Sequence, residues 1–277
     1  MGYQKTMYRL GLGCWLVLLA GCDLSSSVIG EDRVATRDME AKITVTAFDA
    51  TQTEVWAQLR DMSDVTGDPV YVSLYNDYFR ASTAGDLSVL DYDDDLFDNT
   101  AGISGEVKRL KPDTDIDPEE YSARFDGDYT GRTFTVSLLR KDKRVSAPNS
   151  AVTMPEGFTL SAPVSGQAFT LSSEDIVINW SPVTTAVNDN MFVVYTASCV
   201  NGNNYEHKFE VTPGGSADTG SFTISLADLQ AEIPGISTDC NVNLKVQRSR
   251  LGTPDPAYGL GNITAHQERQ VRITVNP

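Results

Sequence analysis

The chain has 277 residues, with 22 Lys and Arg against 38 Asp and Glu, which gives a formal net charge of −16 at pH 7. A chain this acidic lacks the broad basic surface that nucleic-acid phosphates require, and it is repelled by an anionic lipid leaflet. Its length suits two domains of ordinary size. After the N-terminal segment, no apolar run approaches the roughly 20 residues that cross a bilayer.

Residues 1–21 have the layout of a secretory signal peptide. Lys5 and Arg9 precede an apolar core from Leu10 to Leu18, which at about nine residues is too short to span a membrane. The small residues Ala20 and Gly21 stand just before Cys22. One interpretation is an ordinary signal peptide followed by an incidental cysteine.

The other interpretation rests on Leu19-Ala20-Gly21-Cys22, which resembles the lipobox of bacterial lipoproteins. The resemblance implies cleavage before Cys22, a diacylglyceryl group on its thiol and acylation of its amine, for example by palmitate. Several acyl chains give stable membrane anchoring where one does not. The chain would then lie in the cell envelope, facing the periplasm or the cell surface.

The sequence does not decide whether the anchor lies in the inner or the outer membrane. Asp23 resembles the signal that retains enterobacterial lipoproteins at the inner membrane, but sorting rules differ between bacteria, so inner and outer membrane both remain. Without residues 1–21, which contain Lys5 and Arg9, the charge is 20 − 38 = −18. We therefore expect the lipid on Cys22 to be the whole of the membrane attachment.

Residues 22–38 are predicted to be a lipidated tether. From Asp23 to Asp38 the sequence is polar and has no sustained period, which favours a flexible segment. As a flexible coil it would reach about 20 Å.

Residues 39–146 are predicted to form a first, acidic β-sandwich domain. Apolar and polar residues alternate in several short runs separated by turn residues, which is typical of an all-β sandwich. The expected strands lie at 41–47, 55–59, 70–75, 107–110, 121–125 and 134–138.

One corner of this domain, Asp117-Pro118-Glu119-Glu120-Tyr121-Ser122-Ala123, resembles the start of strand F in immunoglobulin-like domains. The resemblance implies that the Tyr121 hydroxyl bonds back across the corner. Ala123 stands where antibody domains have their second cysteine, so that disulfide is absent here.

A domain boundary is expected near 145–157. The charged run Arg140–Arg144 is followed by Ser146-Ala147-Pro148-Asn149-Ser150 and then by Pro155, a composition typical of a short linker.

Residues 157–277 are predicted to form a second β-sandwich. Ile176, Ile178 and Trp180 alternate before Ser181-Pro182, Phe192–Tyr195 follows, and Val242, Leu244 and Val246 form a later strand. This order resembles a fibronectin type III domain, with Trp180 on strand B and Tyr195 on strand C. Cys240 takes the place of the corner tyrosine at the start of strand F. The fold class is thus all-β, two tandem immunoglobulin-like and fibronectin type III-like sandwiches.

Cys199 and Cys240 are the cysteines left once Cys14 leaves with the signal peptide and Cys22 is lipidated. An even pair in an oxidising compartment favours a disulfide, and two buried free thiols are the alternative. In the fibronectin-like arrangement the end of strand C lies beside the start of strand F, which would bring Cys199 and Cys240 together. Such a disulfide would close a loop of roughly 40 residues, which would stabilise the fold by roughly 3–4 kcal/mol.

The sequence offers no set of catalytic residues. His207 and His266 fall in different expected strands, and the nucleophile-elbow, zinc, redox and phosphate-loop motifs are missing. Carboxylates remain, but a glycosidase needs two at fixed separation and sequence cannot select the pair. We therefore predict no catalytic site, no cofactor and no enzyme.

Two acidic clusters could bind calcium, Asp91–Asp98 and Asp113–Glu120, because alternating aspartates supply oxygen ligands. Neither cluster has EF-hand register, and a solvated loop is the alternative, so no metal site is assigned. The long segment Leu251–Gly261 carries Tyr258, whose side chain looks exposed. The segment is predicted to be either a binding loop or a solvated loop without a ligand.

The function expected is therefore a lipid-anchored, non-catalytic envelope protein whose sandwiches bind an unidentified protein or glycan partner, or carry load. The alternatives are a glycan-binding module and a calcium-stabilised adhesion or assembly factor. Aromatic rings that could hold a glycan are Tyr75, Tyr78, Tyr92 and Tyr258.

Overall fold

The computed structural model describes residues 27–63, 70–83, 105–113, 117–141, 144–170, 175–186, 188–212, 217–225 and 238–277. The described part is built from β-strands, with two short 3-10 helices, η1 (Glu31–Arg33) and η2 (Thr36–Asp38). Neither helix has the length and apolar character needed to span a bilayer. The predicted all-β class is confirmed.

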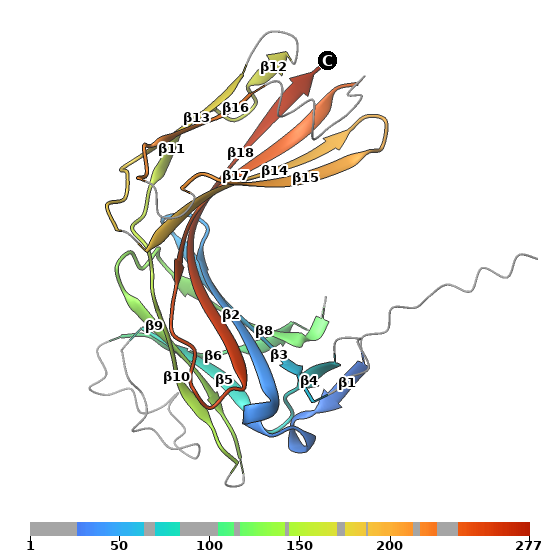
Figure 1. The fold of residues 1–277 in the computed structure, drawn as a ribbon, viewed down its shortest axis with the longest axis vertical. Coiled ribbons are helices and arrows are strands. Elements are labelled where there is room, and N and C mark those ends of the chain that lie inside the picture. Colours follow the sequence, from blue (N-terminus) through green and yellow to red (C-terminus); the bar gives the residue numbers. More distant parts are fainter. Residues whose placement is uncertain are drawn as a thin grey trace, which may run out of the picture.

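The strands form three sheets that enclose two cores (Figure 1). The 11-stranded sheet contains β1 (Ser27–Gly30), β4 (Val70–Ser73), β3 (Gln52–Asp61), β2 (Met39–Ala47), β18 (Leu260–Asn276), β17 (Cys240–Leu251), β14 (Asp189–Cys199) and β15 (Asn204–Glu210), with β7 (Lys111–Asp113), β8 (Asp117–Asp126) and β12 (Ala168–Thr170) at its sides. A second sheet has the order β10 (Ala147–Thr153), β9 (Thr133–Leu139), β5 (Tyr78–Ser82), β6 (Val107–Arg109), and a third has the order β11 (Thr159–Ala162), β13 (Ile176–Ser181), β16 (Ser221–Ile224).

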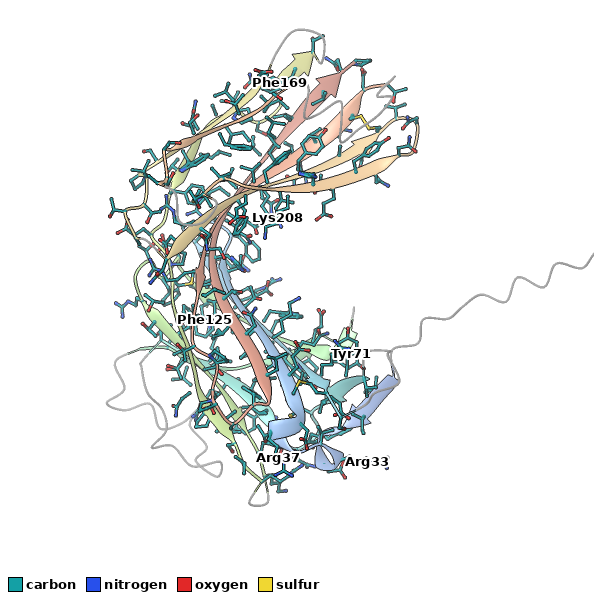
Figure 2. The ribbon with its side chains drawn as sticks, in the orientation of Figure 1. Arg33, Arg37, Tyr71, Phe125, Phe169 and Lys208 are labelled. Atoms are coloured by element: carbon teal, nitrogen blue, oxygen red, sulfur yellow. A yellow bond between two sulfur atoms is a disulfide. The ribbon has the colours of Figure 1, made fainter. Side chains whose placement is uncertain are left out.

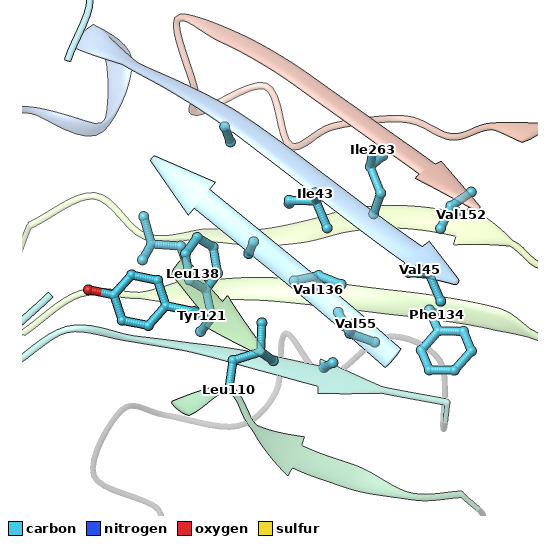
Figure 3. Close-up of a cluster of buried hydrophobic side chains, with 14 of the residues drawn as sticks. Ile43, Val45, Val55, Leu110, Tyr121, Phe134, Val136, Leu138, Val152 and Ile263 are labelled. Atoms are coloured by element: carbon cyan, nitrogen blue, oxygen red, sulfur yellow. The ribbon is translucent and has the colours of Figure 1, made fainter. Parts of the chain in front are cut away.

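The N-terminal lobe is the sandwich between the second sheet and one end of the large sheet. Alternate residues of β2 and β3 point into its core, which explains the period of two in those segments. Figure 3 shows the packing of Ile43, Val55, Phe134 and Val136 between the two sheets.

The pairing order in this lobe resembles that of an immunoglobulin constant-type domain. Strands β2-β3-β8-β7 follow the A-B-E-D order, and β5-β9-β10 follow C-F-G in the facing sheet. Tyr121 lies on β8, which pairs with β3, so it occupies the position of strand E. The prediction of strand F for Tyr121 is wrong, and its hydroxyl accepts a hydrogen bond from the distant Leu74 N–H at 2.6 Å instead of closing a local corner.

The C-terminal lobe is the sandwich between the third sheet and the other end of the large sheet. Strands β11-β13-β16 stand as A-B-E and β14-β17-β18 as C-F-G, the division of strands expected for such a sandwich. Trp180 and Tyr195 are buried in its core at 3% and 1% exposure. Cys199 pairs with Cys240 across β14 and β17, and the two form the predicted disulfide with a Cα–Cα distance of 3.9 Å.

Strand β18 belongs to both lobes. Residues Leu260–Gln267 pair in parallel with β2 of the N-terminal lobe, while Thr264–Val275 pair with β17. Ile263 and Ala265 lie in the N-terminal core, whereas Ile273 and Val275 lie in the C-terminal core. One continuous sheet therefore runs through both sandwiches (Figure 1).

The segment expected to be a linker is largely structured. Ala147–Thr153 forms β10, which pairs with β9 and closes the second sheet, so a linker prediction for these residues is wrong. The chain passes between the cores in a few residues, since Met154 is buried in the N-terminal core and Phe158 in the C-terminal core.

The connection between β17 and β18 seals the N-terminal lobe. Gly252 lies against the Ala151 carbonyl and Val152, where a Cβ would collide. Asp255 accepts a hydrogen bond from Asn149 N–H at 2.7 Å. Tyr258 is buried in the N-terminal core at 6% exposure, so its predicted exposure is wrong.

The tether predicted to run to Asp38 is folded from Ser27 onwards. Strand β1 pairs in parallel with β4, and the buried Glu31 carboxylate accepts hydrogen bonds from the N–H groups of Tyr75 and Asn76 at 2.9 and 2.8 Å. Flexibility is therefore wrong for residues 27–38. The polar sequence of this segment suggested a flexible tether, because Glu31 and Thr36 are buried through hydrogen bonds and not through apolar contact.

A buried arginine fixes the junction between the lobes. Arg248 on β17 donates to the carbonyls of Glu156 at 2.9 Å and Pro182 at 2.7 Å, and to Asp218 Oδ2 at 3.1 Å. Its guanidinium lies 5.1 Å from the centre of the Phe158 ring. We call these five residues the junction cluster.

Candidate binding face

The large sheet has one face that points away from both cores. Figure 1 shows its two ends bending toward the same side, so this face, which we call the inner face, is concave. Its side chains alternate along each strand with those of the cores. They are Lys42, Thr44 and Thr46 of β2, Glu54, Trp56 and Gln58 of β3, Thr264 and His266 of β18, Lys245, Gln247 and Ser249 of β17, and Asn190, Phe192 and Val194 of β14.

Two aromatic rings on the inner face each make a cation–π contact with a lysine. Lys42 Nζ lies 5.5 Å from the centre of the Trp56 ring, and Lys208 Nζ lies 3.8 Å from the centre of the Phe192 ring. Figure 2 shows Lys208 at the concave side of the C-terminal lobe. A cation over a ring contributes about 0.5–1 kcal/mol at an exposed site. The pairs hold each ring on the sheet surface and place a charge beside it.

His266 lies near the middle of the inner face, paired with Ser249 on one side and Thr46 on the other. Burial, reinforced by the charges of Lys208 and Lys245, lowers the pKa of His266 to about 4. The imidazole is therefore neutral at pH 7, and its buried Nδ1 has no hydrogen-bond partner. Lys245 in turn lies 3.4 Å from the Glu268 carboxylate.

The two histidines do not form a common site. His207 is paired with Tyr195, whose side chain is in the C-terminal core, so it projects from the sheet face opposite to that of His266. The sequence had shown both residues but not their faces, because strand register decides which side each occupies.

The candidate glycan-binding tyrosines are dispersed. Tyr75 is 73% exposed, whereas Tyr78 is partly covered by the Arg109 guanidinium at 4.6 Å and Tyr258 is buried. Tyr92 lies outside the described residues. Among the three described tyrosines, Tyr75 is thus the most exposed.

Other predicted sites fall wholly or partly beyond the described residues. Cys22 and the acidic cluster Asp91–Asp98 are outside them, as are residues 114–116 of the second cluster. Within the described ranges, no three His, Cys, Asp or Glu side chains gather closely enough to hold a metal ion. Calcium binding stays a prediction.

No family model matches the sequence, and no curated protein matches it. Among solved structures, a tetra-tandem repeat in the extending region of a large adhesion protein is 13% identical with a TM-score of 0.23, covering 84% of this chain and 49% of the other. The FN1–FN3 domains of chicken CNTN1 are 14% identical with a TM-score of 0.20, covering 83% and 65%. The calcium-binding domain pair CBD12 of CALX1.2 is 12% identical with a TM-score of 0.18, covering 84% and 99%. At such TM-scores the likenesses carry no argument about function.

Proposed function

We propose that this chain is a lipid-anchored, non-catalytic cell-envelope protein that presents the inner face of a rigid two-lobed scaffold to a partner. The observation that carries the proposal is the sharing of β18 between the lobes. Two domains joined by a short linker move against each other by default, whereas an unbroken ladder of backbone hydrogen bonds opposes such motion.

The junction cluster supports rigidity independently. Rotation between the lobes would strain the hydrogen bond from Arg248 to the carbonyl of Glu156, which lies in the connection between the two cores. It would also part Arg269 of β18 from the Ala47 carbonyl of β2, to which its Nη1 donates at 3.5 Å. A fixed concave face suits a binding or load-bearing role because its geometry is set before a partner arrives.

The anchor in this proposal is the lipid on Cys22. Because the first described strand, β1, begins at Ser27, the connection from Cys22 spans at most about 18 Å when fully extended. The N-terminal lobe would therefore stand next to the bilayer, and the C-terminal lobe, which carries the end of β18 far from β1 (Figure 1), would point away from it.

Fractionation of bacteria grown with an alkyne analogue of palmitate tests the anchor. The wild-type chain should be labelled and recovered with membranes, and Cys22→Ser should be unlabelled and unprocessed or released. A Cys22→Ser chain that still takes up the alkyne label would contradict acylation at Cys22.

Crosslinking in intact envelopes tests the inner face. Trp56→Ala combined with Phe192→Ala should remove any crosslinked partner of the wild-type chain. Val177→Ala with Val183→Ala is the matched control, because these residues are 44% and 43% exposed in or next to the third sheet, away from the inner face. Equal loss in both pairs, or in neither, would reject the inner face as the contact.

A glycan ligand is the second candidate, favoured by the 73% exposure of Tyr75. Tyr75→Ala should then abolish binding to purified envelope glycans. Unchanged glycan binding in that variant would remove Tyr75 as its platform.

A further inference from the structure

A basic pocket lies at the base of the N-terminal lobe, where the chain enters the fold. It has a volume of about 490 Å³, within the range of small-molecule sites. The N-terminal segment supplies Arg33 and Arg37, and the connection after β9 supplies Arg140 and Arg144. Figure 2 shows Arg33 and Arg37 at this end of the molecule. Asp32 is the acidic residue among the lining residues.

Arg140 forms the frame of the pocket. Its Nε donates to Asp77 Oδ2 at 2.9 Å, and its Nη1 donates to the Val34 carbonyl at 2.8 Å. Its Nη2 donates to the Glu31 carbonyl at 2.5 Å. With 4% exposure and each nitrogen engaged, Arg140 holds the N-terminal segment in place and has little left to offer a ligand.

Arg144 differs because one of its nitrogens is unused. Its Nη2 donates to Asp77 Oδ1 at 3.0 Å and its Nε to the Lys141 carbonyl at 3.0 Å. Its Nη1 is buried and has no hydrogen-bond partner. A buried charged donor without an acceptor is costly, so this atom marks a place where an acceptor is missing.

Arg33 and Arg37 add charge that the fold does not use. Both are exposed, and the Arg37 side chain, 85% exposed, lies 3.9 Å from Asp38, a distance at which a surface ion pair is weak. Arg33, Arg37 and Arg144 therefore line one small volume in a chain of net charge −16.

We propose that this pocket binds a phosphate-bearing ligand, whose phosphate oxygens accept hydrogen bonds from the guanidinium groups of Arg33, Arg37 and Arg144. Guanidinium donors match phosphate geometry, and a phosphate carries more charge and more acceptors than a single carboxylate. Val34, Val145 and Ala257 also line the pocket and provide an apolar wall for the carbon part of the ligand.

The phosphate can come from a soluble ester or from a lipid headgroup, and two probes separate these sources. The protein is the chain from residue 22 with Cys22→Ser, which keeps every described residue and carries no acyl chain. Calorimetric titration with glycerol 3-phosphate tests the soluble source. Flotation with phosphatidylglycerol vesicles, compared with phosphatidylcholine vesicles, tests the headgroup.

Binding of glycerol 3-phosphate identifies a soluble ligand, and binding of phosphatidylglycerol vesicles alone identifies a headgroup. In either case Arg33→Gln with Arg37→Gln should weaken binding by at least about tenfold, and raised salt should weaken it further. The matched control is Arg60→Gln with Arg124→Gln, which removes the same charge from exposed positions on β3 and β8 and should leave binding unchanged. Arg144→Gln, with its folding checked by circular dichroism, should weaken binding as well.

Absence of binding to both probes would overturn the proposal. Equal weakening by the Arg33/Arg37 and Arg60/Arg124 pairs would overturn it too, because it would show attraction by overall charge and not by the pocket.

Discussion

The junction cluster and the basic pocket both centre on arginines next to a buried aspartate. They differ in whether every guanidinium nitrogen has a hydrogen-bond partner. At the junction, Arg248 is 0% exposed, and its nitrogens meet two carbonyls, Asp218 and the Met191 sulfur. At the base, Arg144 keeps a nitrogen without a partner, and Arg33 and Arg37 face solvent.

The difference separates an arginine that holds a fold together from arginines that can receive a ligand. A saturated guanidinium in a closed site contributes rigidity, and its donors cannot be recruited without breaking the structure. An unsaturated one beside a cavity can gain an acceptor without breaking an existing hydrogen bond. Stability should therefore depend most on Arg248 and least on Arg33 and Arg37.

Arg248→Met should have the largest effect on stability. It leaves the Asp218 carboxylate, 1% exposed, without its cation, and loss of one partner of a buried pair costs about 3–5 kcal/mol. The free energy of unfolding in urea measures this. Arg248→Met with Asp218→Asn should recover part of the loss, and a single variant as stable as wild type would contradict the structural role of the junction cluster.

The sequence predicted most of the strands but little of what joins them. Alternation in β2 and β3 appears because each has one apolar face, and Trp180 and Tyr195 mark a sandwich core. The shared strand β18 was not foreseen, since its parallel pairing with β2 joins residues more than 200 positions apart and has no local signal.

The basic pocket was still less predictable. Arg33, Arg37 and Arg144 belong to segments that look like a tether and a domain boundary, and only the burial of polar groups brings them together. The disulfide was predictable because the expected compartment and the expected strand order agreed on Cys199 and Cys240. Tyr258 shows the opposite case, since a Pro- and Gly-rich segment looks solvated until its packing is known.

Glu31→Gln should destabilise the base by a smaller amount than the change at the junction. Burial alone would raise the pKa of Glu31, but the N–H groups of Asn76 and Tyr75 and the nearby Arg144 charge outweigh it and lower the pKa below its usual 4.5. Two hydrogen bonds to a charged acceptor would weaken, for a loss of about 1.5–3 kcal/mol.

The pH dependence of this effect has a fixed sign. Since the folded pKa lies below the unfolded one, the stabilisation by Glu31 is present above about pH 4.5 and is lost as the pH falls through the folded value. Unfolding curves of wild type and Glu31→Gln should therefore differ at neutral pH and converge in acid. A gap that widens on acidification would contradict a carboxylate held ionised at the base.

Arg144→Gln should cost less again, about 1 kcal/mol, because it removes one ion pair to Asp77 but also an unsatisfied buried donor. Asp77 retains Arg140 at 2.9 Å. Urea unfolding compares this variant with Arg140→Gln, which should be distinctly less stable. Equal losses of stability would mean that Arg140 and Arg144 are both structural. Only Arg33 and Arg37 would then remain as arginines that the fold does not need.

Arg33→Gln with Arg37→Gln should have the smallest effect, within about 0.5 kcal/mol of wild type, as is usual for exposed positions outside buried networks. Thermal melting compares this variant with Arg60→Gln combined with Arg124→Gln, which loses the same two positive charges. Combined with at least about tenfold weaker phosphate binding, unchanged melting would separate ligand recognition from folding at the same pocket. A large drop in melting temperature would instead assign Arg33 and Arg37 to the structural network of Arg140. The arginines of the basic pocket would then stabilise the fold, as Arg248 does in the junction cluster.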